Sequence, residues 1–196
     1  MSNSKENSNN NKTLIIVGIL IVLTVIGSYF IYNKNKGNES DEGVLGVNRV
    51  KTDFVDTTPQ VTGVEGTFDV DTSLPVCKED GLPVVYLFST TWCPHCEWIK
   101  DTFDKVAKEY MNAGKLFAYH YELDTKDDTL TSGKENNVPQ EALNVYKRFN
   151  PNGSIPTFVV GCKYWRVGNG FEASQDLNAE EKELRAIFDK VIADSK

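Results

Sequence analysis

The chain has 196 residues, with 21 Lys or Arg, 28 Asp or Glu and a formal net charge of −7 at pH 7. This length accommodates one domain of ordinary size and an additional segment. The first 40 residues contain four Lys and two Glu, which leaves 17 basic and 26 acidic residues in the rest of the chain, a net charge of −9. So acidic a C-terminal part argues against nucleic acid or anionic lipid as its partner.

The N-terminal segment has two compositions. Residues 1–12 are rich in Asn and Ser, and we predict a disordered polar tail. Residues 13–32 contain no charged side chain and, as a helix, would be about 30 Å long, the thickness of a bilayer's hydrocarbon core. A buried helix and a cleaved signal peptide are the alternatives. A core helix would normally have a polar face, and no A-x-A cleavage pattern follows, so we predict an uncleaved transmembrane signal-anchor.

Residues 33–70 show no sustained periodicity and predict a linker, with one short strand near Val61–Val70. The lysines on the two sides of the apolar segment are balanced and give no orientation. All four cysteines follow that segment, and an even number that includes a CxxC pair suits an oxidising compartment. We therefore predict a single-pass membrane protein with a cytoplasmic N-terminus and an extracytoplasmic C-terminal domain.

Residues 71–196 have the pattern of a compact α/β domain. The run VVYLFS, residues 84–89, is apolar and rich in β-formers, which is typical of a central strand covered on both faces. A helix follows the CPHC motif of residues 93–96. Its predicted apolar face contains Ile99, Phe103, Val106 and Tyr110, and its polar face Lys100, Asp101, Asp104, Lys105 and Lys108.

Further along, residues 116–123 predict a second strand, residues 125–137 a polar insertion and residues 141–149 a short helix. Residues 154–169 predict two strands joined at Gly161–Cys162, with Lys163 and Arg166 on the solvent face of this hairpin. Residues 178–181 resemble a capping box that opens a C-terminal helix. The apolar face of that helix contains Leu184, Ile187, Phe188 and Val191.

The CPHC motif joins the central strand to a helix, and this position has chemical consequences. Pro94 falls at the first helical position, where its missing N–H has no effect. Cys93 therefore lies at the helix N-terminus, where unpaired N–H groups and the helix dipole favour a thiolate, the nucleophile of disulfide exchange. Cys96 lies one turn further in and is predicted to be the resolving thiol. A protonated His95 would stabilise the Cys93 thiolate and make the disulfide a stronger oxidant.

A zinc site and a purely structural bridge are the alternatives for Cys93 and Cys96. A structural zinc ion takes four ligands, usually from two such pairs. The chain has no second CxxC pair and only two histidines, His95 and His120. Asp124, Asp127 and Asp128 lack the spacing of a calcium loop and are interpreted as a solvated acidic loop. We predict no metal and no organic cofactor.

The order of a strand, Trp92-Cys-Pro-His-Cys96, a helix and then Ile155-Pro156-Thr157 before a later strand resembles the thioredoxin superfamily over about residues 74–196. The resemblance implies a thioredoxin-like fold, a central mixed β-sheet flanked by helices. It also implies a cis bond before Pro156 and a substrate-binding platform made by Ile155 and Pro156, with Trp92 on its rim. Phe88, Tyr164 and Trp165 could extend this apolar rim, or Tyr164 and Trp165 could belong to the core.

Within the superfamily, the Pro94-His95 dipeptide resembles the DsbA-type oxidases, whereas the Ile-Pro-Thr sequence is more similar to thioredoxin itself. The family's buried acid six positions before the first cysteine is replaced by Leu87. His120 aligns with the lysine beside that acid. We hypothesise that His120 transfers the proton of Cys96; a strand histidine satisfied by hydrogen bonds is the alternative.

The resemblance also concerns the other two cysteines. In this fold, the start of the CxxC-bearing strand and the end of the strand after the cis-proline lie at the same pole. Cys77 and Cys162 should therefore meet there, and we predict a structural disulfide, with two unpaired thiols as the alternative.

These observations together predict a membrane-anchored, thioredoxin-like thiol:disulfide oxidoreductase. Its partners would be thiol- or disulfide-containing protein substrates, and a membrane or soluble redox partner that recycles the dithiol. An oxidase or isomerase of exported proteins is the first interpretation. An extracytoplasmic reductase and a non-catalytic interaction module are the alternatives.

Overall fold

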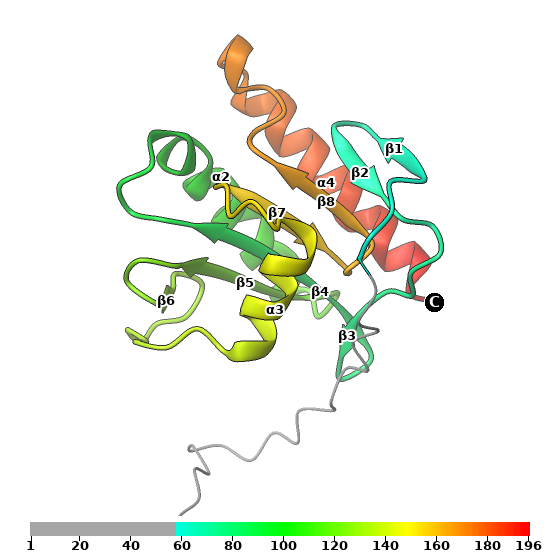
Figure 1. The fold of residues 1–196 in the computed structure, drawn as a ribbon, viewed down its shortest axis with the longest axis horizontal. Helices are drawn as coiled ribbons and strands as arrows, with labels where there is room; N and C mark the ends of the chain where they lie inside the picture. Colours follow the sequence, from blue (N-terminus) through cyan, green and yellow to red (C-terminus); the bar gives the residue numbers. More distant parts are fainter. Residues whose placement is uncertain (1–57) are drawn as a thin grey trace, which may run out of the picture. The chain divides into compact units, whose positions relative to one another are not determined.

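The computed structural model describes residues 58–196, which form an α/β fold (Figure 1). The predicted polar tail of residues 1–12, the signal-anchor of residues 13–32 and most of the predicted linker lie outside the described residues. Within residues 58–196, no helix is both long enough and apolar enough to cross a membrane.

A mixed β-sheet forms the centre of the fold. Its strand order is β1-β2-β8-β7-β4-β5-β6, and the short β3 pairs with β4 outside this path. The central β4 is parallel to β5 and antiparallel to β7. The strands are β1 (Gly63–Glu65), β2 (Phe68–Val70), β3 (Lys78–Glu79), β4 (Leu82–Ser89), β5 (Phe117–Glu122), β6 (Asp127–Asp128), β7 (Thr157–Val160) and β8 (Tyr164–Val167).

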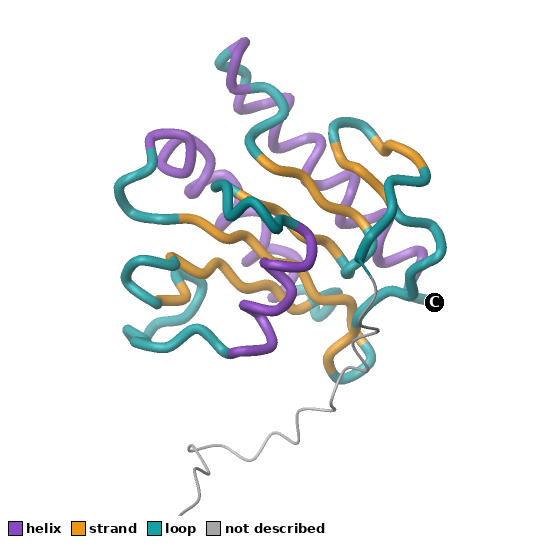
Figure 2. The backbone as a smooth tube through the Cα atoms, viewed as in Figure 1, coloured by secondary structure: helices purple, strands orange, loops and turns teal. Residues whose placement is uncertain are grey.

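Helices cover both faces of the sheet (Figure 2). They are α2 (Pro94–Asn112), α3 (Gln140–Phe149) and α4 (Leu177–Asp194), with a short 3₁₀ turn, η1 (Glu172–Ser174), before α4. Alternate residues of β4 belong to two cores. Val85 and Leu87 pack with the apolar faces of α2 and α4, and Tyr86 and Phe88 pack with that of α3. The predicted apolar faces of the first and last helices are buried.

The sheet begins earlier in the sequence than predicted. Residues 63–70, assigned to the linker, form the β1–β2 hairpin, and β2 pairs with β8 through Asp69–Trp165 and Val70–Tyr164. The reason is apolar burial, because Phe68 and Val70 point into the main core. The domain therefore includes this hairpin as well as the predicted residues 71–196.

The C-terminal helix also begins earlier than its predicted capping box at residues 178–181. Its N-cap is Asp176, whose side chain accepts a hydrogen bond from the Ala179 N–H at 2.9 Å. Glu180, a member of the expected box, is fully buried and has another role, described below.

The predicted Cys77–Cys162 disulfide is present, with a Cα–Cα distance of 5.4 Å. It lies at the pole of β4 opposite the CPHC motif, where Cys77 N–H donates to the Gly161 carbonyl at 2.9 Å. Gly161 has a φ of 62°, and a Cβ there would lie 2.3 Å from Val191 Cγ2. Only glycine fits this turn, which lets the end of β7 reach the disulfide.

Candidate active site

Cys93 and Cys96 are brought together by the junction between β4 and α2. Cys93 is the N-cap residue of α2, and Pro94 follows in the first turn. Both thiols are free and buried, with 5% and 2% of their residue surfaces exposed. The Cys93 carbonyl accepts the first helical hydrogen bond, from Glu97 N–H at 3.0 Å. Both cysteines therefore lie in the first turn of a helix, where unpaired backbone N–H groups favour negative charge.

The Cys96 thiol ionises less readily than an ordinary thiol. Burial, followed by a hydrogen bond with Cys93, raises the pKa of Cys96 to about 12, against the opposing hydrogen bond from the Thr90 backbone. Burial also raises the pKa of Tyr146, with a smaller contribution from the charge of Cys96. Cys96 is thus protonated at neutral pH and needs a proton acceptor before it can act as a nucleophile.

Pro156 lies at the same end of the sheet as the CPHC motif. The Ile155–Pro156 peptide bond is cis, and the next residue, Thr157, pairs with Phe88 near the end of β4. Gly168 N–H donates to the Pro156 carbonyl at 2.8 Å. Ile155 is half-buried, and Trp92 beside Cys93 is 71% exposed.

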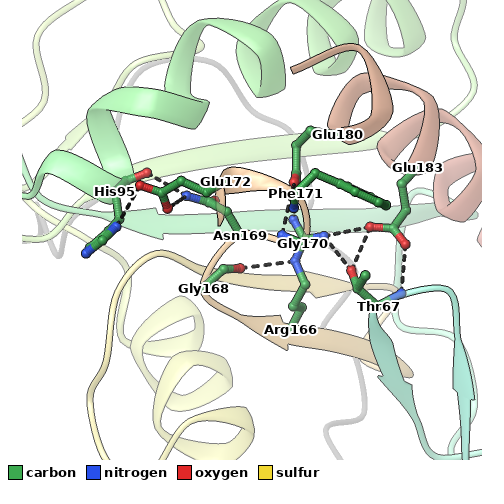
Figure 3. A network of polar contacts seen from close by, with 10 residues as sticks. All are labelled: Thr67, His95, Arg166, Gly168, Asn169, Gly170, Phe171, Glu172, Glu180 and Glu183. Carbon is green, nitrogen blue, oxygen red and sulfur yellow. Dashed lines mark hydrogen bonds and ion pairs between the residues drawn. The ribbon is translucent and has the colours of Figure 1, made fainter. Parts of the chain in front are cut away.

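His95 contacts a loop that the sequence did not connect with the motif (Figure 3). Its Nδ1 lies 2.8 Å from Glu172 Oε1, and its backbone carbonyl accepts from Asn169 Nδ2 at 2.8 Å. Desolvation would raise the pKa of Glu172, but hydrogen bonds from Asn169 and His95 hold it below its usual range. These partners are more than 70 positions from His95 in the sequence, and no motif marked them.

The sequence was also compared with known proteins. A family model described as "Thioredoxin-like domain" matches residues 70–182, more than half of the chain. The chain belongs to this thioredoxin-like domain family. A comparison with curated proteins found no match.

His120 is fully buried in this thioredoxin-like domain, beside Leu87 in the β4–β5 register. Its Nδ1 lies 2.6 Å from Asp104 Oδ1, and its Nε2 lies 2.8 Å from Ser89 Oγ. Because a carboxylate only accepts hydrogen bonds, Nδ1 carries the proton in the neutral ring, and Nε2 accepts from the Ser89 hydroxyl. Thr129 Oγ1 completes the cluster, at 2.8 Å from Nδ1 and 3.0 Å from Asp104 Oδ2.

The prediction that Arg166 lies on a solvent face is wrong. Its side chain is 5% exposed, and its guanidinium carbon lies 4.5 Å from the Phe68 ring centroid and 4.6 Å from that of Phe158. It forms ion pairs with Glu180 and Glu183. Lys163, placed on the same face, is half-buried and pairs with Asp194 at 2.9 Å.

The expected apolar rim around Cys93 is smaller than predicted. Trp92 is exposed, but Phe88, Tyr164 and Trp165 have 0%, 2% and 7% of their surfaces exposed and belong to the core. Tyr164 packs with α4, and Trp165 stacks at a tilt on Phe149 with their centroids 5.3 Å apart.

The acidic residues of the 124–128 segment contact the chain around them. Asp124 accepts from the Thr91 backbone and hydroxyl, at 3.1 Å and 2.5 Å for the closest contacts. Asp127 accepts from Glu135 N–H, and the buried Asp128 accepts from His120 N–H. Across residues 58–196, no group of three or more His, Cys, Asp or Glu side chains is arranged to hold a metal ion.

Proposed function

We propose that this protein is a thiol:disulfide oxidoreductase whose Cys93 and Cys96 cycle between a dithiol and a disulfide. The observation that carries the proposal is the placement of Cys93 at the N-cap of α2, with the shielded Cys96 in the same helical turn. Pro156 and Ile155 at the same sheet end would bind the polypeptide around the reacting disulfide, and Trp92 would add an exposed apolar contact.

The exchange follows from the different environments of the two thiols. In the reducing direction, the Cys93 thiolate attacks a substrate disulfide, a mixed disulfide forms, and one substrate sulfur leaves as a thiolate. The Cys96 thiolate then attacks Cys93 Sγ, the Cys93–Cys96 disulfide forms, and the second substrate sulfur leaves. Two electrons pass from the dithiol to the substrate. An oxidase runs the same steps in reverse.

We favour oxidation or isomerisation of exported proteins over reduction. The Pro94-His95 dipeptide, which resembles that of the DsbA-type oxidases, supports this direction, because a protonated His95 would stabilise the reduced form and make the disulfide more oxidising. The Cys77–Cys162 disulfide supports an oxidising, extracytoplasmic compartment. The charge-free segment of residues 13–32 would anchor the domain to the membrane, and a membrane or soluble redox partner would recycle the dithiol.

Cys96 needs a proton acceptor, and we assign this role to His120. A backbone hydrogen bond from Thr90 opposes the rise in the Cys96 pKa, and the preceding residue, Ser89, donates to His120 Nε2 at 2.8 Å. The Ser89 hydroxyl would pass its proton to His120 while taking the proton of Cys96, and Asp104 would stabilise the imidazolium. Asp104 is 18% exposed, which gives the proton a route to solvent. This relay replaces the acid missing at Leu87.

The test uses the full-length chain and two serine variants. With a disulfide-containing substrate peptide, Cys96→Ser should accumulate a mixed disulfide at Cys93, because the resolving attack is lost. Cys93→Ser should abolish exchange, and a glutathione titration of the native protein should give one two-electron potential for Cys93–Cys96. A value near −120 mV marks an oxidant and one near −270 mV a reductase. If cells in which Cys93→Ser replaces the native protein show no loss of function, the protein would instead be a non-catalytic module.

A further inference from the structure

The loop of residues 168–172 connects the two halves of the candidate site. At its start, Gly168 N–H donates to the Pro156 carbonyl at 2.8 Å. One residue later, Asn169 Nδ2 donates to the His95 carbonyl in the first turn of α2, also at 2.8 Å. The loop therefore contacts both the cis-proline segment and the CPHC helix, although it belongs to neither.

A buried ionic cluster of Arg166, Glu180 and Glu183 holds this loop at the end away from His95 (Figure 3). Glu180 accepts from Gly170 N–H at 3.0 Å and from Phe171 N–H at 2.9 Å, and Arg166 Nε donates to the Gly168 carbonyl at 3.0 Å. A Cβ at Gly170 would lie 2.7 Å from Arg166 Nη1. Because the backbone is held by buried charged groups, the side chains that leave the loop start from a fixed position.

Glu172 leaves this loop toward His95 and is held at both carboxylate oxygens. Oε1 lies 2.8 Å from His95 Nδ1, and Oε2 accepts from Asn169 Nδ2 at 2.8 Å. Glu172 is 23% exposed and His95 64% exposed at the side chain. In the part of the chain that the structure describes, the His95 ring makes its hydrogen bond to Glu172 and none to Cys93.

We infer that Glu172 is a positioning residue that directs the His95 Nδ1–H away from Cys93 and thereby limits how oxidising the proposed dithiol is. The inference rests on the proposed function. A ring released from Glu172 could turn its N–H toward the Cys93 thiolate, and a hydrogen bond to the thiolate would stabilise the reduced form. Stabilising the reduced form makes the disulfide a stronger oxidant. The CPHC motif alone would thus overstate the oxidising power of this chain.

Two substitutions of Glu172 separate its role as a hydrogen-bond acceptor for His95 from the effect of its negative charge. Glu172→Ala removes the acceptor, whereas Glu172→Gln removes the charge but keeps a carbonyl oxygen for His95. We expect Glu172→Ala to raise the equilibrium constant for oxidising glutathione about two- to tenfold, the contribution of one hydrogen bond, and Glu172→Gln to remain close to the native value. Mass mapping of alkylated Cys93 and Cys96 in the full chain reports this pair separately from Cys77–Cys162. Glu109→Ala, near the other end of α2, is the matched control.

A second background tests whether Glu172 acts through His95. In His95→Gln, adding Glu172→Ala should leave the constant unchanged, because no imidazole remains to be released. Equal shifts for Glu172→Ala and Glu172→Gln, or a shift that persists in His95→Gln, would overturn the inference, as would a native value for Glu172→Ala. Those results leave the exchange activity intact. If Cys93 and Cys96 of the native protein fail to equilibrate with glutathione at all, the proposed function falls, and the inference with it.

Discussion

At the scale of single residues, the most consequential group is His120, because a thiol with a pKa of about 12 is almost fully protonated at neutral pH. We expect His120→Gln to slow the resolving step by about 10² or more, the usual contribution of a general base. Without the base, the rate should rise about tenfold per pH unit, since each unit below the pKa of Cys96 changes its thiolate fraction by that factor.

The measurement is the single-turnover release of a peptide from its mixed disulfide with Cys93, followed from pH 6 to pH 9 in the full chain. Ser89→Ala should give the same steep pH dependence, because it interrupts the same relay. Glu109→Ala is the control, since Glu109 lies near the other end of α2, pairs with Arg185 and takes no part in the relay. A native rate and pH profile in His120→Gln would show that this histidine is only a hydrogen-bonded strand residue.

Residue patterns predicted the two cysteines of this site, but only the structure showed which side chains contact His120. The spacing of the CxxC motif and the position of Pro94 indicated both cysteines and the start of the helix. Asp104 was assigned to the polar face of α2, yet it lies next to Phe103 at the border of the buried face, from which its carboxylate reaches His120. Periodicity separates two faces of a helix, but it does not show which border residue turns inward.

At the scale of elements, β8 shows why Arg166 was misplaced. A hairpin strand with one solvated face would alternate buried and exposed residues, but Tyr164, Trp165 and Arg166 are all buried. The β1–β2 hairpin pairs with this strand through β2. Phe68 and Phe158 stack on the guanidinium, and Glu180 reaches it from α4. These residues lie in four different elements, and Phe68 is almost 100 positions from Arg166, so no pattern within β8 marked the ion pair.

This arrangement predicts a large effect for Arg166→Met. The substitution would leave Glu180 buried without its counter-ion, and breaking a buried ion pair typically costs about 3–5 kcal/mol. Urea unfolding of the full chain, followed by tryptophan fluorescence, measures the loss. Arg185→Met removes a half-buried arginine paired with Glu109 and Glu181 and should cost less than about 1 kcal/mol. Similar losses in the two variants would contradict a special role for the buried pair.

At the scale of the whole molecule, the fold separates a structural pole from a reactive pole. The reactive pole could be predicted from the order of the central strand, the CPHC motif and the helix, whereas the Cys77–Cys162 pole was predicted from the resemblance to the thioredoxin superfamily, which implies that the end of β7 returns to the start of β4. The early hairpin was not predicted as part of the domain, since its two three-residue strands are too short for a periodic signal and are stabilised by pairing with β8.

This separation predicts that the Cys77–Cys162 disulfide stabilises the domain without setting the potential of Cys93–Cys96. The bridge joins residues 85 positions apart, and a loop of that length corresponds to about 4–5 kcal/mol in the chain-entropy account. Cys77→Ala/Cys162→Ala should therefore lower the free energy of unfolding by up to that amount in urea. The glutathione equilibrium of Cys93–Cys96, measured under conditions in which the variant remains folded, should stay within about twofold of the native value, because the bridge lies at the far end of β4. A larger shift of the glutathione equilibrium would mean that the two poles are coupled through the central strand. An unchanged urea midpoint would mean that the bridge contributes little to the stability of the folded chain.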